Sequence, residues 1–317
     1  MLEPGDAERL ALAFGLDGEA RLEGPVDRGE QGQVWRLDVR GERYAVKETF
    51  APLEDEQARL AHAFQLRAAA AGVRAPEAIL AREGEVLVRF GAEALRLYRW
   101  VDMARPDRTI SPEQVGRCLA GLHRSGPRLE TRTHPWYFEP VGRARWDDLT
   151  RRLEQQGASF VGRLAGLVDQ LVAVESIFVE PTAPILCHRD LFADNLRSTP
   201  DGGLVVIDWD NCGAASADQE LGMVLLEFGL DEDRVTRLFQ SYRSAGGPGR
   251  ITSTSDLTMP AAAVGHIGEL GCRQWLEAPD EAARSRAAGR VEEFLSEPWT
   301  LQVLERLVRV VRAAADS

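Results

Sequence analysis

The segment from Asn195 to Asp208 constrains the fold most, because its residues have the pattern of a β-hairpin. At its centre, Pro200-Asp201-Gly202-Gly203 is a strong turn signal, since proline presets one backbone dihedral and glycine accepts positive φ. The run Leu204-Val205-Val206-Ile207 that follows is apolar and mostly β-branched, as is typical of a strand. Because a hairpin returns its last residue beside its first, we expect Asn195 and Asp208 to meet at the open end.

The two residues at that open end carry oxygen atoms that suit a hard cation. A carboxamide oxygen and a carboxylate are ligands that Mg²⁺ accepts, so we expect Asn195 and Asp208 to bind this ion. Asp190 lies five residues before Asn195 and is close enough to face the same pocket without binding the metal. Its carboxylate is then free to accept a proton from an attacking hydroxyl. These residues make up most of a phosphoryl-transfer site. For His188 we expect a structural role in the loop.

Lys47 is the only lysine in the chain, and arginine supplies every other positive side chain. A lysine ammonium is a compact point charge that can hold a phosphate without the planar fork of arginine. Lys47 ends an alternating strand-like run and needs an acidic partner to fix its position. With Leu53 as the centre of the apolar stripe of the next helix, 100° steps place Glu56 nearest the buried edge and Glu54 next. We therefore expect Glu56 to pair with Lys47, with Glu54 as the alternative.

Two glycines precede this strand and could fold over phosphates. Gly29 and Gly32 flank Glu30-Gln31, and backbone N–H groups in such a turn can bind an anion. Any tight turn would use the same residues, so this signal is weak by itself. The chain contains no GxxxxGK[ST] segment, which disfavours a P-loop nucleotide-binding protein.

Strand-like and helix-like segments divide unevenly along the chain. Strand-like runs occupy residues 33–37, 44–47, 85–90 and 95–100, whereas most of the chain after Ser111 has helical periodicity. A helix is also expected from Pro52, because proline suits a first helical turn. The polar segment 102–107 separates the two regions. We therefore predict an α+β protein with a small β-rich N-terminal lobe, residues 1–101, and a larger helical lobe, residues 102–317.

The net charge of −12 and pI near 5.1 argue against nucleic acid or an anionic membrane as partner, since both repel an acidic surface. The four cysteines are far apart and form no CxxC pair, so zinc binding and a disulfide framework are not expected. The first residues lack the apolar stretch of a secretory signal. We expect a cytoplasmic protein with reduced thiols.

Several motifs together resemble the aminoglycoside phosphotransferase family, a branch of the protein-kinase-like fold. The resemblance spans roughly residues 24–230 and is most specific over 187–222. The matching motifs are Ala45-Val46-Lys47, Leu119-Ala120-Gly121-Leu122-His123, Cys187 to Asn195, Ile207-Asp208-Trp209-Asp210 and Asp218-Gln219-Glu220-Leu221-Gly222. One departure is Arg189, which stands where the family more often has glycine.

This resemblance implies an ATP- and Mg²⁺-dependent kinase with a two-lobe protein-kinase-like fold. It implies that Asp190 is the catalytic base and that Asn195 and Asp208 are the Mg²⁺ ligands. Lys47 would hold the α- and β-phosphates, and Arg99-Trp100-Val101 would be the hinge beside adenine. A protein kinase is not expected, because the apolar run from Glu220 follows Asp208 too closely for a peptide-docking segment. The acceptor is then a hydroxyl of a small molecule.

The sequence leaves the acceptor open. Acidic residues after Gly213 would suit a polyamine antibiotic, and aromatic residues would suit a choline-like cation. Homoserine and an amino sugar are further alternatives, and a kinase-like binding protein without activity is the rival from another class. The residues weighed for an acidic or aromatic pocket are Asp231-Glu232-Asp233, Glu269, Glu277, Trp136, Tyr137, Phe138 and Trp275.

Overall fold

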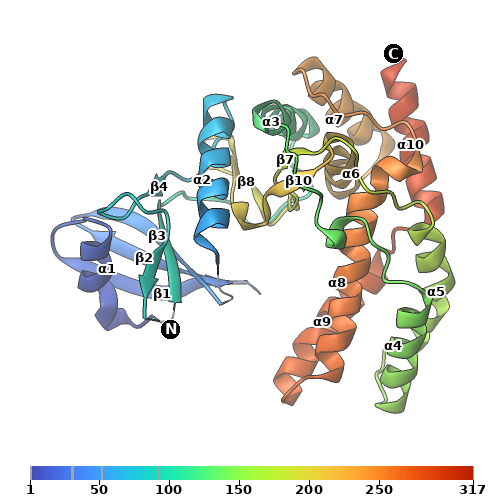
Figure 1. Cartoon of the computed structure of the whole chain (residues 1–317), viewed down its shortest axis with the longest axis horizontal. Coiled ribbons are helices and arrows are strands. Elements are labelled where there is room, and N and C mark those ends of the chain that lie inside the picture. Colours follow the sequence, from blue (N-terminus) through green and yellow to red (C-terminus); the bar gives the residue numbers. More distant parts are fainter. Residues whose placement is uncertain (1, 30–31, 51–52, 92, 317) are drawn as a thin grey trace. The chain divides into compact units, whose positions relative to one another are not determined.

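The computed structural model describes residues 2–29, 32–50, 53–91 and 93–316. Two compact units make up the chain (Figure 1). The first contains residues 1–107 and 193–212, and the second contains residues 108–192 and 213–317. This division differs from the boundary expected after residue 101, because the segment 102–107 and the predicted hairpin both belong to the first unit.

Hydrogen bonds explain why the hairpin belongs to the first unit. The Ala104 N–H donates to the Ser198 carbonyl at 2.8 Å, and the Val206 N–H donates to the Arg74 carbonyl at 2.9 Å. The Arg197 guanidinium also donates to the Ala104 carbonyl. These bonds attach both arms of the hairpin to segments of the N-terminal part of the chain.

The first unit is built mainly from short antiparallel strands. The helix expected from Pro52 begins at Asp55, and Pro52 itself lies outside the described residues. The elements of this unit are η1 (Pro4–Asp6), α1 (Ala7–Ala13), β1 (Ala20–Arg28), β2 (Gly32–Val39), β3 (Glu42–Thr49), α2 (Asp55–Ala70), β4 (Ala78–Ile79), β5 (Val88–Phe90), β6 (Glu93–Arg99), β8 (Leu196–Ser198), β9 (Leu204–Val206) and η3 (Trp209–Asn211).

The main sheet has the order β1-β2-β3-β6-β4, and β5 also pairs with β6. Sequence pattern did not predict β1, because Gly24 and Pro25 interrupt it. An edge strand tolerates such residues, and the pairing of β1 with β2 shifts register between Glu23 and Asp27. The other strand pairs in this sheet are antiparallel, as hairpins and short connections produce.

Helix α1 packs on one face of this sheet, and Lys47 projects from the other face. Leu10 of α1 and Phe14, which follows this helix, pack with Val46 and Leu97 from the sheet, so α1 covers one face. Alternate residues of a strand project to opposite faces. Lys47 and its neighbours on β6 therefore project from the face that is not covered by α1.

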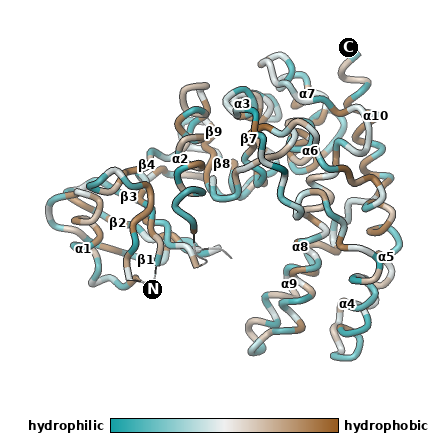
Figure 2. The backbone as a smooth tube through the Cα atoms, in the orientation of Figure 1, coloured by the Kyte–Doolittle hydropathy of each residue, from teal (hydrophilic) through white to brown (hydrophobic). Residues whose placement is uncertain are grey.

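The second unit is mainly helical, as predicted for an α+β fold. Figure 2 shows that β7 is hydrophobic, whereas α4 is largely hydrophilic. The elements are α3 (Pro112–Ser125), η2 (Pro135–Tyr137), α4 (Arg143–Gln155), α5 (Val161–Glu175), β7 (Ile185–Cys187), β10 (Gly213–Ala215), α6 (Ala217–Phe228), α7 (Glu232–Ser244), η4 (Thr254–Leu257), α8 (Thr258–Leu276), α9 (Glu281–Ser296) and α10 (Leu301–Ala315).

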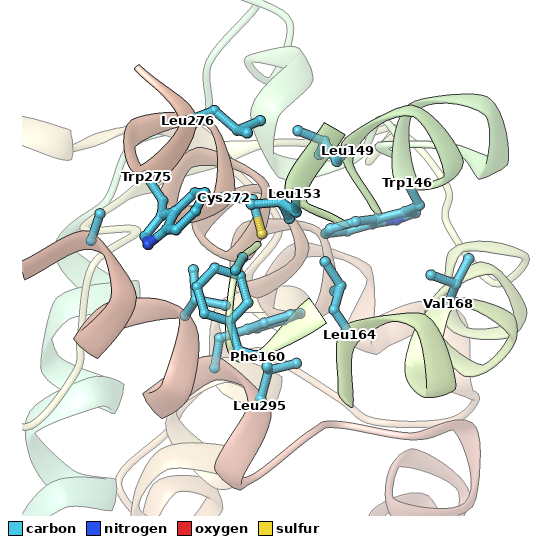
Figure 3. Close-up of a cluster of buried hydrophobic side chains, with 14 residues drawn as sticks. Trp146, Leu149, Leu153, Phe160, Leu164, Val168, Cys272, Trp275, Leu276 and Leu295 are labelled. Carbon is cyan, nitrogen blue, oxygen red and sulfur yellow. The ribbon is translucent and has the colours of Figure 1, made fainter. Parts of the chain in front are cut away.

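One apolar cluster of the second unit lies where α4 and α5 meet α8 and α9 (Figure 3). Trp146 is fully buried there and stacks on Phe294, with ring centroids 6.3 Å apart. A separate cluster surrounds Cys187 and Ala215 of the β7–β10 pair. That pair fixes the chain immediately before the His188-Arg189-Asp190 loop. None of the helices in the described part of the chain combines the length and apolar character needed to span a bilayer.

Candidate active site

Neighbouring strands of the main sheet place two cations side by side. Lys47 on β3 pairs directly with Arg96 on β6 in the antiparallel register. Directly opposed residues project from the same face of a sheet, so both side chains leave the face opposite α1. Lys47 is one-seventh exposed by side chain (15%), and Arg96 is almost fully buried (3%).

The β8–β9 hairpin confirms the expected strand–turn–strand segment. Leu196 pairs with Val206, and the Ile207 N–H donates to the Asn195 carbonyl at 2.9 Å. Asn195 and Asp208 therefore flank the open end of the hairpin. Asp208 has φ 55° and ψ 69°, a left-handed conformation that aspartate tolerates better than most residues. This backbone turns the chain from β9 into η3.

An ion cluster joins Lys47 to the segment that follows the hairpin. Lys47 Nζ lies 2.6 Å from Asp208 Oδ1 and 2.8 Å from Asp210 Oδ2. Arg96 binds both carboxylate oxygens of Asp210, with Nη2 2.5 Å from Oδ2. The Asp208 side chain is 34% exposed, whereas that of Asp210 is 9% exposed. Asp208 therefore retains access for a cation, and Asp210 is enclosed by its two basic partners.

Mutual attraction keeps the buried members of this cluster charged. Burial by itself would lower the pKa of Lys47, but Asp210 and Asp208 raise that pKa above its usual value. Burial would raise the pKa of Asp210, but Lys47 and Arg96 lower it well below its usual range. Lys47 and Asp210 are consequently both ionised at neutral pH.

The predicted pairing of Lys47 with Glu56, or with Glu54 as the alternative, is wrong, because Lys47 pairs with Asp208 and Asp210. Glu56 is exposed on the first turn of α2, and Glu54 precedes the helix and is exposed too. Leu53 lies before the helix begins at Asp55, so it cannot set the phase of the buried stripe. Ala58, Ala61, Phe64, Gln65 and Ala68 set it instead. The α2 residue directed at the ion cluster is Gln57, whose Nε2 donates to the carbonyls of Asp210 at 2.8 Å and Cys212 at 2.9 Å.

The two predicted loop glycines lie where β1 passes into β2. The Gly29 N–H donates to the Gly32 carbonyl at 2.9 Å. A Cβ atom at Gly32 would lie 2.4 Å from the Glu48 carbonyl oxygen, so β3 approaches too closely for any side chain. Glu30 and Gln31 lie outside the described residues.

The predicted hinge follows the end of β6. Arg99 is the last residue of the strand and forms surface ion pairs with Glu42 and Glu77. The Arg99 N–H donates to the Glu77 carbonyl, and the Trp100 N–H donates to the Arg43 carbonyl. The backbone N–H groups of these two residues are thus used within the first unit. Val101 follows without regular secondary structure.

The loop that carries Asp190 lies in the second unit and follows β7 directly. Its anchor is Glu220 of α6, which is fully buried and accepts a hydrogen bond from the Arg189 N–H. His123 Nε2 lies 2.9 Å from Glu220 Oε2, and His123 Nδ1 lies 2.8 Å from the Tyr242 hydroxyl. Three helices thereby hold the backbone one residue before Asp190.

Arg189 itself has an unusual backbone and a defined side-chain environment. Its φ is 67°, in the left-handed region that favours glycine. The Arg189 guanidinium lies over the Tyr137 ring, 4.6 Å from the centroid. Gly213 leaves room for it, because a Cβ atom at Gly213 would lie 2.5 Å from Arg189 Nη2. A glycine at this position would adopt the same backbone without strain.

The residues weighed for the acceptor pocket have other contacts. Glu269 pairs with Arg145, and Asp233 pairs with Arg237. Trp136 stacks on His266 with centroids 4.7 Å apart and packs near Tyr137. Trp275 belongs to the separate cluster between α4, α5, α8 and α9.

The structure therefore brings some of the predicted site residues together. Lys47 contacts Asp208, and Asn195 joins Asp208 at the hairpin end, whereas Asp190 belongs to the second unit. Sequence reasoning gave no role to Arg96, Asp210, Glu220 or His123. One signal for Arg96 was available, because an arginine between Leu95 and Leu97 in an apolar strand needs a buried counter-ion.

Comparisons with known proteins identify the family and the fold of the chain. Residues 24–252 match the APH model, which describes the phosphotransferase enzyme family. Among curated proteins, none matches the chain in sequence.

Solved structures share the fold at low sequence identity. The spectinomycin phosphotransferase APH(9)-Ia, solved with ADP and spectinomycin, is 14% identical with a TM-score of 0.69, covering 100% of this chain and 99% of that one. An aminoglycoside phosphotransferase from Alicyclobacillus acidocaldarius is 15% identical with a TM-score of 0.63, covering 100% and 97%. A choline/ethanolamine kinase family protein from Mesorhizobium loti is 18% identical with a TM-score of 0.57, covering 98% of each chain.

The family model covers well over half of the chain and includes Lys47, the Asp190 loop, the hairpin and the Asp208-Trp209-Asp210 segment. The chain therefore belongs to the phosphotransferase enzyme family, whose enzymes phosphorylate hydroxyl groups of small molecules.

Proposed function

We propose that this enzyme transfers the γ-phosphoryl group of ATP to a hydroxyl of an aminoglycoside-type or other cationic antibiotic, with Mg²⁺ as cofactor. The observation that carries the proposal is the 2.6 Å contact between Lys47 Nζ and Asp208 Oδ1. It joins a cation suited to phosphates with a carboxylate suited to Mg²⁺, beside Asn195. Phosphoryl transfer depends mainly on such positioning and on electrostatic stabilisation.

Asn195 and Asp208 are the proposed metal ligands. The donor set fits Mg²⁺, because both residues offer hard oxygen atoms and the Asp208 carboxylate is one-third exposed. Asp210 is a poorer ligand, since Lys47 and Arg96 enclose it. When bound, Mg²⁺ supplies positive charge that offsets the charge of the phosphate oxygens.

The proposed nucleotide contacts come from the first unit. Lys47 donates to the α- and β-phosphates, and a lysine ammonium has three N–H donors for this purpose. The turn at Gly29 and Gly32 lies over the phosphates through its backbone. Residues Arg99, Trp100 and Val101 lie beside adenine. Because the N–H groups of Arg99 and Trp100 are used elsewhere, carbonyl groups or the Val101 backbone would bind the base.

Asp190 is the proposed catalytic base. Its carboxylate orients the acceptor hydroxyl and accepts its proton as the new O–P bond forms, while the bond between the γ-phosphorus and the bridging oxygen breaks and ADP leaves. Glu220 supports this role, because it holds the N–H of the preceding residue in a buried hydrogen bond. A protein kinase would need a long docking segment after Asp208. Here only η3 and β10 intervene before α6 begins at Ala217, which favours a small acceptor.

The proposed class of acceptor molecule is argued from the net charge of the protein and from the names of its structural relatives. A net charge of −12 favours cationic molecules at the protein surface. By their names, the structural relatives given above are a spectinomycin phosphotransferase, an aminoglycoside phosphotransferase and a choline/ethanolamine kinase family protein. Choline and ethanolamine each combine a hydroxyl with a positively charged nitrogen. The use of ATP also implies a cytoplasmic enzyme, since that is where ATP is abundant.

The test is a phosphate-transfer screen with [γ-³²P]ATP and Mg²⁺. The panel contains spectinomycin, aminoglycosides, choline, ethanolamine, homoserine and amino sugars. We expect transfer to a cationic antibiotic and none with the Asp190→Asn variant. Transfer only to a metabolite would replace the proposed acceptor. If MgATP binds but no panel member is phosphorylated and ATP is not hydrolysed, the chain is a binding protein instead.

A further inference from the structure

Asp210 has two basic partners on adjacent strands. Lys47 Nζ lies 2.8 Å from Asp210 Oδ2, and Arg96 donates to both oxygens of the same carboxylate. The register of β3 and β6 brings Lys47 and Arg96 directly opposite each other, so a single carboxylate can bridge them. A bidentate arginine fixes the plane of a carboxylate. Asp210 thus presents a rigid acceptor to Lys47.

The backbone of Asp210 is also held, and by α2. Gln57 Nε2 donates to the Asp210 carbonyl at 2.8 Å and to the Cys212 carbonyl at 2.9 Å. Trp209 packs edge-to-face on Phe64 of the same helix, with centroids 5.3 Å apart. The helix therefore fixes the 209–212 segment by an amide and an aromatic ring. The acidic residues at its start, Asp55 and Glu56, and Glu54 immediately before it are exposed.

We propose that Asp210, oriented by Arg96, is the positioning residue for Lys47, in place of an acidic residue on α2. This inference rests on the proposed function, in which Lys47 binds nucleotide phosphates. Lys47 and Arg96 carry two positive charges, and Asp208 and Asp210 carry two negative charges, so the cluster is balanced. When Asp208 serves as a metal ligand, Asp210 still holds Lys47. A lysine ammonium can bind this carboxylate and donate a further hydrogen bond to a phosphate.

A spectroscopic test is possible because Lys47 is the only lysine. Protein produced with ¹⁵N-lysine gives one side-chain ammonium signal, and an ion-paired, buried ammonium exchanges slowly enough to be observed. We expect this signal in the wild type. Asp210→Asn should shift or broaden it, whereas the matched control Glu54→Gln should leave it unchanged. A signal that Glu56→Gln changes and Asp210→Asn does not would overturn the proposal.

Steady-state kinetics test the consequence for nucleotide binding. Asp210→Asn should raise the KM for ATP roughly 10- to 100-fold, the range for loss of a charged hydrogen bond, with a smaller change in kcat. Arg96→Met should act in the same direction, and the conservative Arg96→Lys should recover part of the loss. An unchanged KM in folded Asp210→Asn protein would overturn the proposal.

Two further measurements distinguish failure of the proposed function from failure of the inference about Asp210. Thermal unfolding of each variant identifies any that fails to fold, and Arg96→Lys then replaces Arg96→Met in the comparison. If wild-type protein fails to bind MgATP in a thermal-shift assay, the proposed function fails. If it binds MgATP and the NMR signal is insensitive to Asp210→Asn, only the inference about Asp210 fails.

Discussion

The buried carboxylate of Glu220 accepts a hydrogen bond from the backbone N–H of Arg189, the residue before Asp190. This bond ties the loop that carries the proposed base to α6. His123 contributes a second hydrogen bond to the same carboxylate, at 2.9 Å. A buried carboxylate costs free energy unless such partners satisfy it, so Glu220 links loop geometry to the stability of the second unit.

We predict that Glu220 makes stability depend on pH below about 4.5. Burial opposes its ionisation, but the hydrogen bonds from His123 and Arg189 lower the pKa of Glu220 below its usual value of 4.5. Its stabilising contribution is therefore complete above pH 4.5 and is lost as the pH falls towards the lowered pKa. Glu220→Gln should cost about 2–3 kcal/mol at pH 7 and less at lower pH.

Urea unfolding of wild type and Glu220→Gln between pH 7 and 3.5 measures this difference. The control is Glu232→Gln, because Glu232 forms an exposed ion pair with Arg306. Such surface pairs contribute less than about 1 kcal/mol. A wild-type-to-variant difference that stays constant across the pH range would contradict the prediction.

We predict that Asp190→Asn reduces turnover by about 10²- to 10⁴-fold, because an amide cannot take up the proton of the substrate hydroxyl. Nucleotide affinity should change little, since the proposed nucleotide contacts are made by other residues. Single-turnover phosphate transfer and a nucleotide titration measure the two quantities. Asp194→Asn is the matched control, because this aspartate is exposed and lies in the same motif. Equal loss of binding and rate would indicate a structural role for Asp190.

We predict that a lysine-directed ATP analogue modifies one side chain, Lys47, and that MgATP protects it. The chain offers this reagent no other lysine, so the stoichiometry is one label per molecule. Mass spectrometry of a digest locates the label. Lys47→Met should take up none, apart from any reaction at the α-amino group. Labelling of Lys47 that MgATP does not reduce would count against a nucleotide role for this residue.

The hairpin could be predicted from the sequence, because the signals for its strands and turn are local. Turn chemistry at Pro200-Asp201-Gly202-Gly203 is local, and it brings Asn195 and Asp208 together without information from distant segments. The strand of Lys47 shows the same local alternation. The edge strand β1 was not predicted, because Gly24-Pro25 hides a strand that only an edge position tolerates.

The partners of Lys47 could not be predicted in the same way. Their identity depends on the register between β3 and β6 and on where α2 begins, and both are set by tertiary packing. The helix begins at Asp55, three residues after Pro52, so Leu53 lies outside it and the buried stripe that starts at Ala58 leaves Glu56 exposed and directs Gln57 inward. The buried pair of Arg96 and Asp210 joins residues far apart in the sequence, and no local pattern encodes such a contact.

The last prediction concerns Gly213 and Arg189, which lie in contact in the second unit. A methyl group at Gly213 would come within 2.5 Å of Arg189 Nη2 and would push the guanidinium off the Tyr137 ring. Because the guanidinium is the flexible end of a side chain, we expect Gly213→Ala to cost about 1 kcal/mol, the order of a cation–π contact. In an Arg189→Gly background, the same substitution should cost almost nothing. A double-mutant cycle by urea unfolding measures the coupling, and additive effects of the two substitutions would show that Gly213 does not accommodate Arg189.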